Sequence, residues 1–262
     1  MTLLIGVFIY RGTTLTTNYH ASEGEKLNTH KASIVQTGLG VLEFTRAVSY
    51  SGPIFGDGSF KFVPVPENYP SNSSWTYEEL GLSEWLPEDW VYAHYDPEFV
   101  TYTWGSFKND RSSYTRQLSK GDFVFFIASL TYDRSRKVTR EPWVSDNGLY
   151  VVGFFELEEI PQEADILYPI RPEIKRRYSN NAHVRRDPTK GDLVPFLIFK
   201  GTEHSRLLDV AIPFSDGLKP NKLACKAIPN VNPERQKWWS DTLITKEGID
   251  TIFSEISLRN RV

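Results

Sequence analysis

Asp57, Asp96 and His183 carry the side chains best suited to chemistry in this sequence. Asp96 follows His94 by two residues and is itself followed by a proline. In an extended segment, residues two apart point to the same face, so this imidazole and carboxylate could form an acid–base pair or a hydrogen-bond clamp for a base. Capping of the following turn is the competing role for Asp96.

The surroundings of the other two residues leave two roles open for each. Asp57 stands between two glycines, and its simplest role is that of a turn residue, although the glycines would also let a ligand approach the backbone closely. His183 is flanked by Asn181 and Arg185, and it could be a structural residue or a catalyst. We predict Asp57, Asp96 and His183 as the catalytic acid–base groups.

A basic segment surrounds His183. Residues 171–190 hold seven basic and two acidic residues, a local charge of +5, whereas the whole chain has a net charge of −3. Arginine forks and asparagine amides match phosphates and base edges. The alternative is a solvated loop whose arginines pair with Glu158, Glu159 or Glu163 nearby. The predicted nucleotide-binding residues in this segment are Asn181, His183, Arg185 and Arg186.

Aromatic side chains could supply a stacking wall. Tyr102 and Trp104 lie, by sequence context, in an exposed loop where they could stack on a flipped base. The chain has 7 Trp and 13 Tyr, however, and most aromatic residues belong to a protein's core. Arg46 and Arg116 complete the predicted binding set.

Composition excludes several classes of protein. With 262 residues, 40% of them hydrophobic, the chain can bury a full core, and its charge rules out a histone-like polycation. A single cysteine excludes an internal disulfide framework and a zinc site built on several thiolates. The five histidines lie far apart, and P-loop, dinucleotide-binding and nucleophile-elbow motifs are missing. We therefore expect no metal and no cofactor, and a cytoplasmic protein without a membrane segment.

Strands dominate the elements that must position these residues. The apolar runs at 123–130 and 148–157 are typical of buried strands, and residues 193–199 and 207–212 resemble a hairpin. The tail at 230–260 looks helical. The sequence predicts one α+β, mostly β domain over 1–262: a closed or partly open β-barrel at about 46–215, with short helices, an N-terminal extension (1–45) and a C-terminal helix.

The central segment resembles a known group of barrels. The run from Arg111 and Arg116 through Gly-Asp into the apolar strand at 123–130, followed by the strand at 148–157, is similar to PUA-like domains, including the EVE and ASCH branches. The resemblance implies a PUA-like barrel that holds a single, often modified, nucleobase in a pocket at its mouth.

A wider resemblance covers roughly residues 46–215. It is carried by four segments: Gly-Pro-Ile-Phe-Gly-Asp-Gly-Ser-Phe-Lys-Phe-Val-Pro-Val-Pro at 52–66, His-Tyr-Asp-Pro-Glu-Phe-Val-Thr-Tyr-Thr-Trp-Gly at 94–105, the Gly-Asp strand, and Asn-Ala-His-Val-Arg-Arg at 181–186. These segments look like archaeal members of the third nucleotide-modification-associated domain family. Membership would imply a link to modified nucleotides without distinguishing a reader from an enzyme.

Two function hypotheses follow from these patterns. The first is a nucleic-acid-associated protein that recognises a modified or flipped nucleobase in a barrel pocket, with DNA ahead of RNA as the partner. The second is an enzyme that modifies or hydrolyses a nucleotide or DNA base with Asp and His acid–base groups. A structural subunit of a larger complex is the third option. The missing nucleophile and metal motifs slightly favour the reader.

Overall fold

The computed structural model describes most of the chain from Gly52 onward, together with one earlier strand. The described residues are 32–36, 52–107, 118–160, 162–164, 170–187, 189, 196–217, 219–228, 231 and 244–260. None of the described helices has the length and apolar character needed to span a bilayer.

The centre of the fold is an antiparallel pair of long strands, β7 (Phe123–Tyr132) and β8 (Asn147–Glu156). Both are continuous apolar and aromatic runs, as the sequence predicts for strands covered on two faces. Alternate residues of β7 enter different cores: Val124 and Phe126 face one, while Phe125 and Ile127 face the other.

A bulge in this pair redirects the end of β8. The register shifts between Phe126, which pairs with Gly153, and Ile127, which pairs with Val151. One extra residue in one strand exchanges the faces of the side chains that follow. Phe154 accordingly joins the second core, whereas Phe155 joins the first.

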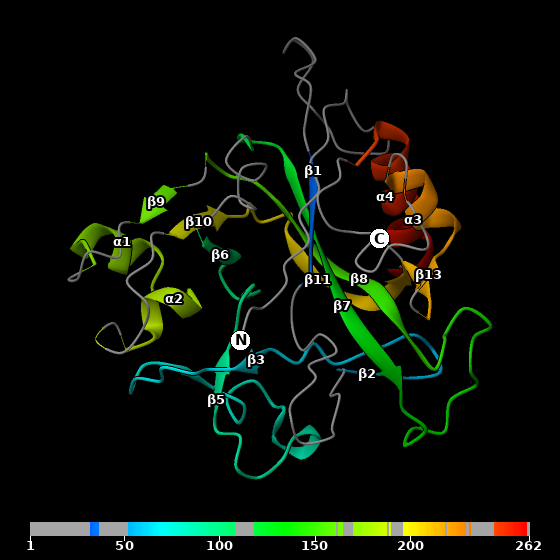
Figure 1. The fold of residues 1–262 in the computed structure, drawn as a ribbon, viewed down its shortest axis with the longest axis horizontal. Coiled ribbons are helices and arrows are strands. Elements are labelled where there is room, and N and C mark those ends of the chain that lie inside the picture. The colour runs from blue at the N-terminus through cyan, green and yellow to red at the C-terminus, as the bar shows by residue number, and fades with distance from the viewer. Residues whose placement is uncertain are drawn as a thin grey trace.

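Three further strands extend the central sheet into a curled half-barrel (Figure 1). Strands β1 (Ala32–Gln36) and β2 (Gly52–Ile54) run parallel to the two halves of β7. Strand β11 (Arg206–Pro213) runs antiparallel to β8 on the other side. The fold is mostly β with short helices and a C-terminal helix, as predicted, and the barrel is partly open.

The expected hairpin between residues 193–199 and 207–212 is wrong. Strand β10 (Phe196–Lys200) pairs with β6 (Thr103–Phe107) and β9 (Gln162–Ala164), whereas β11 pairs with β8. The turn after β10 carries the chain from one sheet to another, a change that local apolar patterning does not reveal.

A small antiparallel sheet, β3 (Val65–Pro66), β5 (Tyr92–His94) and β4 (Trp75–Thr76), lies beside β6. Helices α1 (Pro172–Arg177) and α2 (Ala182–Arg185) lie near β10 and β6, and α2 packs against β6. The candidate site forms where β5, β6 and α2 converge.

Helices on the opposite side cover the second core. Helix α3 (Lys222–Ala227) packs against α4 (Lys246–Asn260), which also contacts β11 (Figure 1). Helix α4 confirms the predicted C-terminal helix within the described part of residues 230–260. The remaining short elements are β12 (Ser215–Asp216), β13 (Lys219–Pro220) and the 3-10 helix η1 (Ser83–Trp85).

Candidate active site

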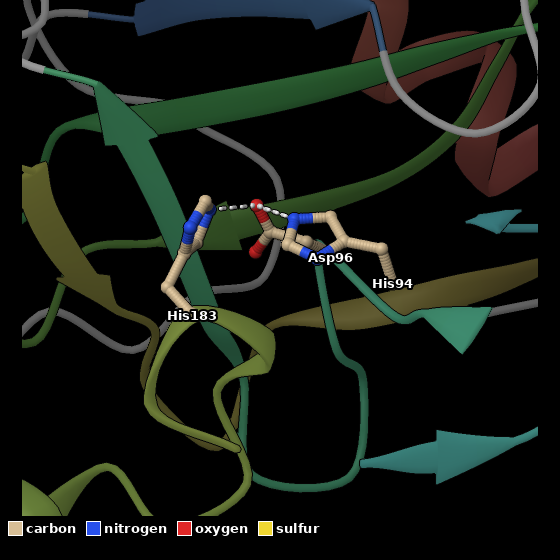
Figure 2. A group of neighbouring side chains, drawn as sticks. All are labelled: His94, Asp96 and His183. Atoms are coloured by element: carbon tan, nitrogen blue, oxygen red, sulfur yellow. Dashed lines mark hydrogen bonds and ion pairs between the residues drawn. The ribbon is translucent and has the colours of Figure 1, made fainter. Parts of the chain in front are cut away.

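A carboxylate between two imidazoles forms the candidate active site (Figure 2). Asp96 Oδ2 lies 3.2 Å from Nε2 of His183 and 3.9 Å from Nε2 of His94. The two rings meet edge to face, with their centroids 4.6 Å apart. The sequence placed His94 and Asp96 on one face of an extended segment; the tertiary structure adds His183 from α2.

Strand β6 orients the carboxylate of Asp96. Its Oδ1 accepts a hydrogen bond of 2.9 Å from the backbone N–H of Gly105, which lies in β6. This bond spans nine residues, so Asp96 joins two segments of the chain. With Oδ1 held by the backbone, Oδ2 faces the two imidazoles.

Two features of the sequence allow His183 to reach Asp96. The side chain of Asn181 caps α2 by accepting a 3.0 Å hydrogen bond from the backbone N–H of His183. On β6, the strand that faces α2, a Cβ at Gly105 would lie 2.1 Å from Cδ2 of His183. Only glycine at this position lets the imidazole approach the strand so closely.

Glu67 is a fourth member of the cluster and was not predicted. It directly follows β3, and its backbone N–H donates to the carbonyl of Tyr92 at 2.9 Å. This pairing brings its Oε2 to 2.7 Å from Nδ1 of His94. Glu67 therefore fixes the ring of His94 from the side opposite Asp96.

Burial shapes the electrostatics of the cluster. The side chains of His183, Asp96 and Glu67 are 3%, 7% and 3% exposed, and that of His94 is 16% exposed. Burial lowers the pKa of His183, against the opposing effect of its hydrogen bond with Asp96. Burial pushes the pKa of Glu67 upward, but hydrogen bonding to His94 and the charges nearby outweigh it and leave this pKa lowered. The cluster thus favours a neutral His183 and an ionised Glu67.

Asp57 lies in a turn, as the simpler of its two predicted roles requires. Its Oδ1 accepts hydrogen bonds from the backbone N–H and the hydroxyl of Ser59, at 3.0 and 2.6 Å. The hydroxyl bond is the largest effect on Asp57 and lowers its pKa. The group of neighbouring His and Asp residues found in the described part of the chain consists of His94, Asp96 and His183, without Asp57. Asp57 is therefore not brought to the other two predicted acid–base residues.

The two predicted stacking residues differ in position. Trp104 is 1% exposed and packs on Phe199, with ring centroids 4.5 Å apart, so the expectation that it lies in an exposed loop is wrong. It belongs to β6, whose alternation directs this indole into the first core. Tyr102 is half-buried, has a positive φ of 60° and contacts Phe155.

The predicted basic segment divides into an inward and an outward part. The guanidinium of Arg185 lies 3.9 Å from the ring centroid of Trp75, and its Nε donates to the carbonyl of Ser73. Arg186 is 8% exposed and lies 5.9 Å from the ring centroid of Tyr69. Arg186 is buried like Asn181, whereas Arg185 is half-buried; both arginines lie against aromatic rings and help to hold α2 in place.

The outward part of the segment is helix α1. Arg171, Lys175, Arg176 and Arg177 are exposed there, on the helix that precedes α2. Arg177 pairs with Glu159 at 2.5 Å, as the alternative of a salt-bridged surface anticipates. Lys175 and Arg176 provide exposed positive charge beside α2.

Sequence reasoning found part of this cluster. The His-x-Asp spacing revealed His94 and Asp96, and the flanking Asn and Arg drew attention to His183. Glu67 and Gly105 carried no usable signal, because their roles depend on the pairing of β3 with β5 and on the packing of α2 against β6. The predicted contacts Arg46 and Arg116 lie outside the described residues.

The family model for nucleotide modification associated domain 3 matches residues 45–220. The chain belongs to this family. The match spans the central strand pair and every member of the cluster, and membership links the protein to nucleotide modification. No curated protein and no solved structure matches the chain. The resemblance to PUA-like, EVE and ASCH domains stays a prediction. So does the resemblance to archaeal members of the nucleotide-modification-associated family.

Proposed function

We propose that this protein is an enzyme that acts on a nucleotide, or on a nucleobase within a nucleic acid, at the cluster of His94, Asp96 and His183. The observation that carries the proposal is the convergence of two imidazoles on one oxygen of Asp96. Membership of a nucleotide-modification-associated family supplies the class of substrate. Of the two hypotheses raised by the sequence, the geometry favours the enzyme.

The environment of the cluster supports chemistry more than simple recognition. A reader of flipped bases needs aromatic walls and neutral hydrogen-bonding groups, whereas an enzyme needs a carboxylate or imidazole aimed at the reacting atom. Trp104, one of the two predicted stacking residues, lies in the core. Buried titratable groups that contact one another are, by contrast, a common mark of active sites.

Recognition of a modified base remains the second candidate, and helix α1 favours it. The exposed Lys175 and Arg176 could contact phosphates beside the cluster. An enzyme that acts on bases within DNA or RNA would need the same phosphate contacts. Lys175 and Arg176 therefore indicate the class of ligand and do not distinguish a reader from an enzyme.

The test is a turnover assay on modified and unmodified nucleotides and oligonucleotides. Asp96→Asn removes the charge that faces both imidazoles and is expected to lower the turnover rate at least 100-fold. Asp57→Asn, whose residue lies in a turn outside the cluster, is expected to leave the turnover rate unchanged. Affinity for the substrate is measured on the same variants. Unchanged affinity with lost turnover supports the enzyme. If wild-type protein binds modified oligonucleotides selectively and turns over none of them, the reader replaces it.

A further inference from the structure

The cluster has the composition and shape of a transition-metal site. We infer that His94 Nε2, Asp96 Oδ2 and His183 Nε2 bind one divalent first-row transition ion of the zinc or iron(II) type. This inference rests on the proposed function for the ion's use, because the ion would supply the reactive centre of that enzyme. The binding of the ion itself is independent of turnover.

The distances carry the first part of the argument. One ligand atom from each of the three residues lies within 4.8 Å of the others, and two of the separations are 3.2 and 3.9 Å. Ligand atoms at about 2.1 Å from an ion in tetrahedral or octahedral geometry are about 3.0–3.5 Å apart. A rotation of the His94 ring toward Asp96 would complete the approach.

The hydrogen bonds around the cluster carry the second part. In the tautomer of His94 that carries its hydrogen on Nδ1, this N–H donates a hydrogen bond to Glu67, and Nε2 presents a lone pair toward Asp96. An imidazole lone pair and a carboxylate oxygen that face each other are both electron donors and repel. A cation bound between them would accept electron density from both. A metal-bound histidine usually donates its other ring N–H to a carboxylate, which orients the ring, and Glu67 is placed to accept such a bond from His94. Gly105 gives Asp96 the same support through Oδ1.

The buried charge carries the third part. Two carboxylates, Glu67 and Asp96, are almost fully buried in contact with the two imidazoles. Burial of charge is costly unless an opposite charge accompanies it. A divalent ion held between the two imidazoles and Asp96 would supply such a charge.

The ligand types indicate which ion is expected. Two imidazoles and one carboxylate suit zinc in three-ligand catalytic sites and iron(II) in facial triads, whereas Mg²⁺ prefers oxygen ligands. Three protein ligands leave at least one coordination position for water or for a substrate oxygen. A zinc-type ion would lower the pKa of that water and so suit hydrolysis or deamination of a base, while iron(II) would suit oxidation by O₂.

The test is direct metal binding to the untagged full-length chain after removal of metals with EDTA. We expect calorimetry with Zn²⁺ to give one equivalent bound at micromolar affinity or tighter. Co²⁺ should give visible absorption bands that Zn²⁺ abolishes and that millimolar Mg²⁺ leaves intact. His94→Ala should weaken binding at least 100-fold, and Glu67→Gln about 10- to 100-fold. The matched control, His204→Ala, removes an exposed histidine outside the cluster and should bind as the wild type does.

Circular dichroism and thermal melting of the metal-free variants establish whether they fold. If His94→Ala does not fold, Glu67→Gln, which keeps all three ligands, provides the test of binding. Absence of Zn²⁺ and Co²⁺ binding to the wild type would overturn the inference, as would equal affinities for wild type and His94→Ala. The two proposals fail separately. Stoichiometric binding without turnover contradicts only the enzyme, and full turnover by EDTA-stripped protein that binds no metal contradicts only the metal site.

Discussion

The carboxylate of Asp96 and the imidazole of His183 are 87 residues apart in the chain, and their Oδ2 and Nε2 atoms lie 3.2 Å apart. The contact joins the segment after β5 to helix α2 across strand β6. It is possible because Gly105 leaves room for the ring and donates its own N–H to the same carboxylate. A single strand residue thus sets the distance between two reactive side chains.

Gly105→Ala is expected to displace His183. The new methyl group would lie 2.1 Å from Cδ2 and 2.8 Å from Nε2 of the ring, a clash that should cost about 1–3 kcal/mol of unfolding free energy and remove activity. The check is a double-mutant cycle by chemical denaturation with His183→Ala. Because the smaller residue restores space, the double variant should recover much of the loss; strictly additive effects would contradict the clash.

Asn181→Ala should affect the site beyond its effect on stability. The change removes the cap bond to His183, worth about 1 kcal/mol. Asn221→Ala is the control. Asn221 caps α3 on the other side of the sheet by accepting a 3.0 Å bond from the N–H of Ala224, and its amide also donates to the carbonyl of Pro213. This control should lose at least as much stability as Asn181→Ala in denaturant titrations, and only Asn181→Ala should lose turnover. Equal turnover in the two variants would show that the cap does not position His183.

Lys175→Ala/Arg176→Ala should weaken binding to oligonucleotides and reduce its salt dependence. Each lost phosphate contact lowers the slope of log K against log salt by about 0.7–0.9. Lys219→Ala/Lys222→Ala removes the same charge from the exposed surface near α3 and should leave the slope unchanged. Fluorescence anisotropy at several salt concentrations measures both. The same slope for both double variants would exclude α1 as the contact surface.

Arg185→Ala is expected to act through stability and not through salt. Its guanidinium stacks on Trp75, a contact worth about 0.5–2 kcal/mol, and its Nε donates a hydrogen bond to the carbonyl of Ser73; the alanine variant loses both contacts. Partial burial lowers the pKa of Arg185, whose side chain is half-buried. Thermal denaturation should show the loss, while the salt slope of oligonucleotide binding stays as in the wild type. A changed slope at unchanged stability would return Arg185 to the binding surface predicted from the sequence.

Asp57 should contribute to stability only above acidic pH. Its pKa in the folded chain is lowered from 3.8, chiefly by the hydroxyl of Ser59, so its stabilising effect is complete above that value and disappears as the pH falls through the lowered pKa. The melting temperature of Asp57→Ala should therefore lie below that of the wild type at pH 7, and the difference should shrink at pH 3. A difference independent of pH would assign the effect to turn conformation alone.

The fold was predictable where patterning is local. Continuous apolar runs identified β7 and β8, because strands covered on both faces need no polar positions. The error over β10 and β11 arose because a short turn between two apolar segments is compatible with a hairpin and with a crossing between sheets. Trp104 was misplaced for a related reason: its burial depends on the sheet that pairs with β6, and the flanking residues do not encode that partner.

For the candidate site, the sequence by itself determined the chemical groups and one local spacing. His94 and Asp96 share a face because extended chains repeat every two residues, and Asp57 is a turn residue because it lies between glycines. The tertiary structure alone decided that His183 joins this pair, that Glu67 stands behind His94, that Arg185 packs on Trp75 and that Arg186 is buried. The hydrogen bonds made by His94, His183 and Arg185 span 27, 87 and 112 residues and depend on strand pairing and helix packing, which residue order does not specify.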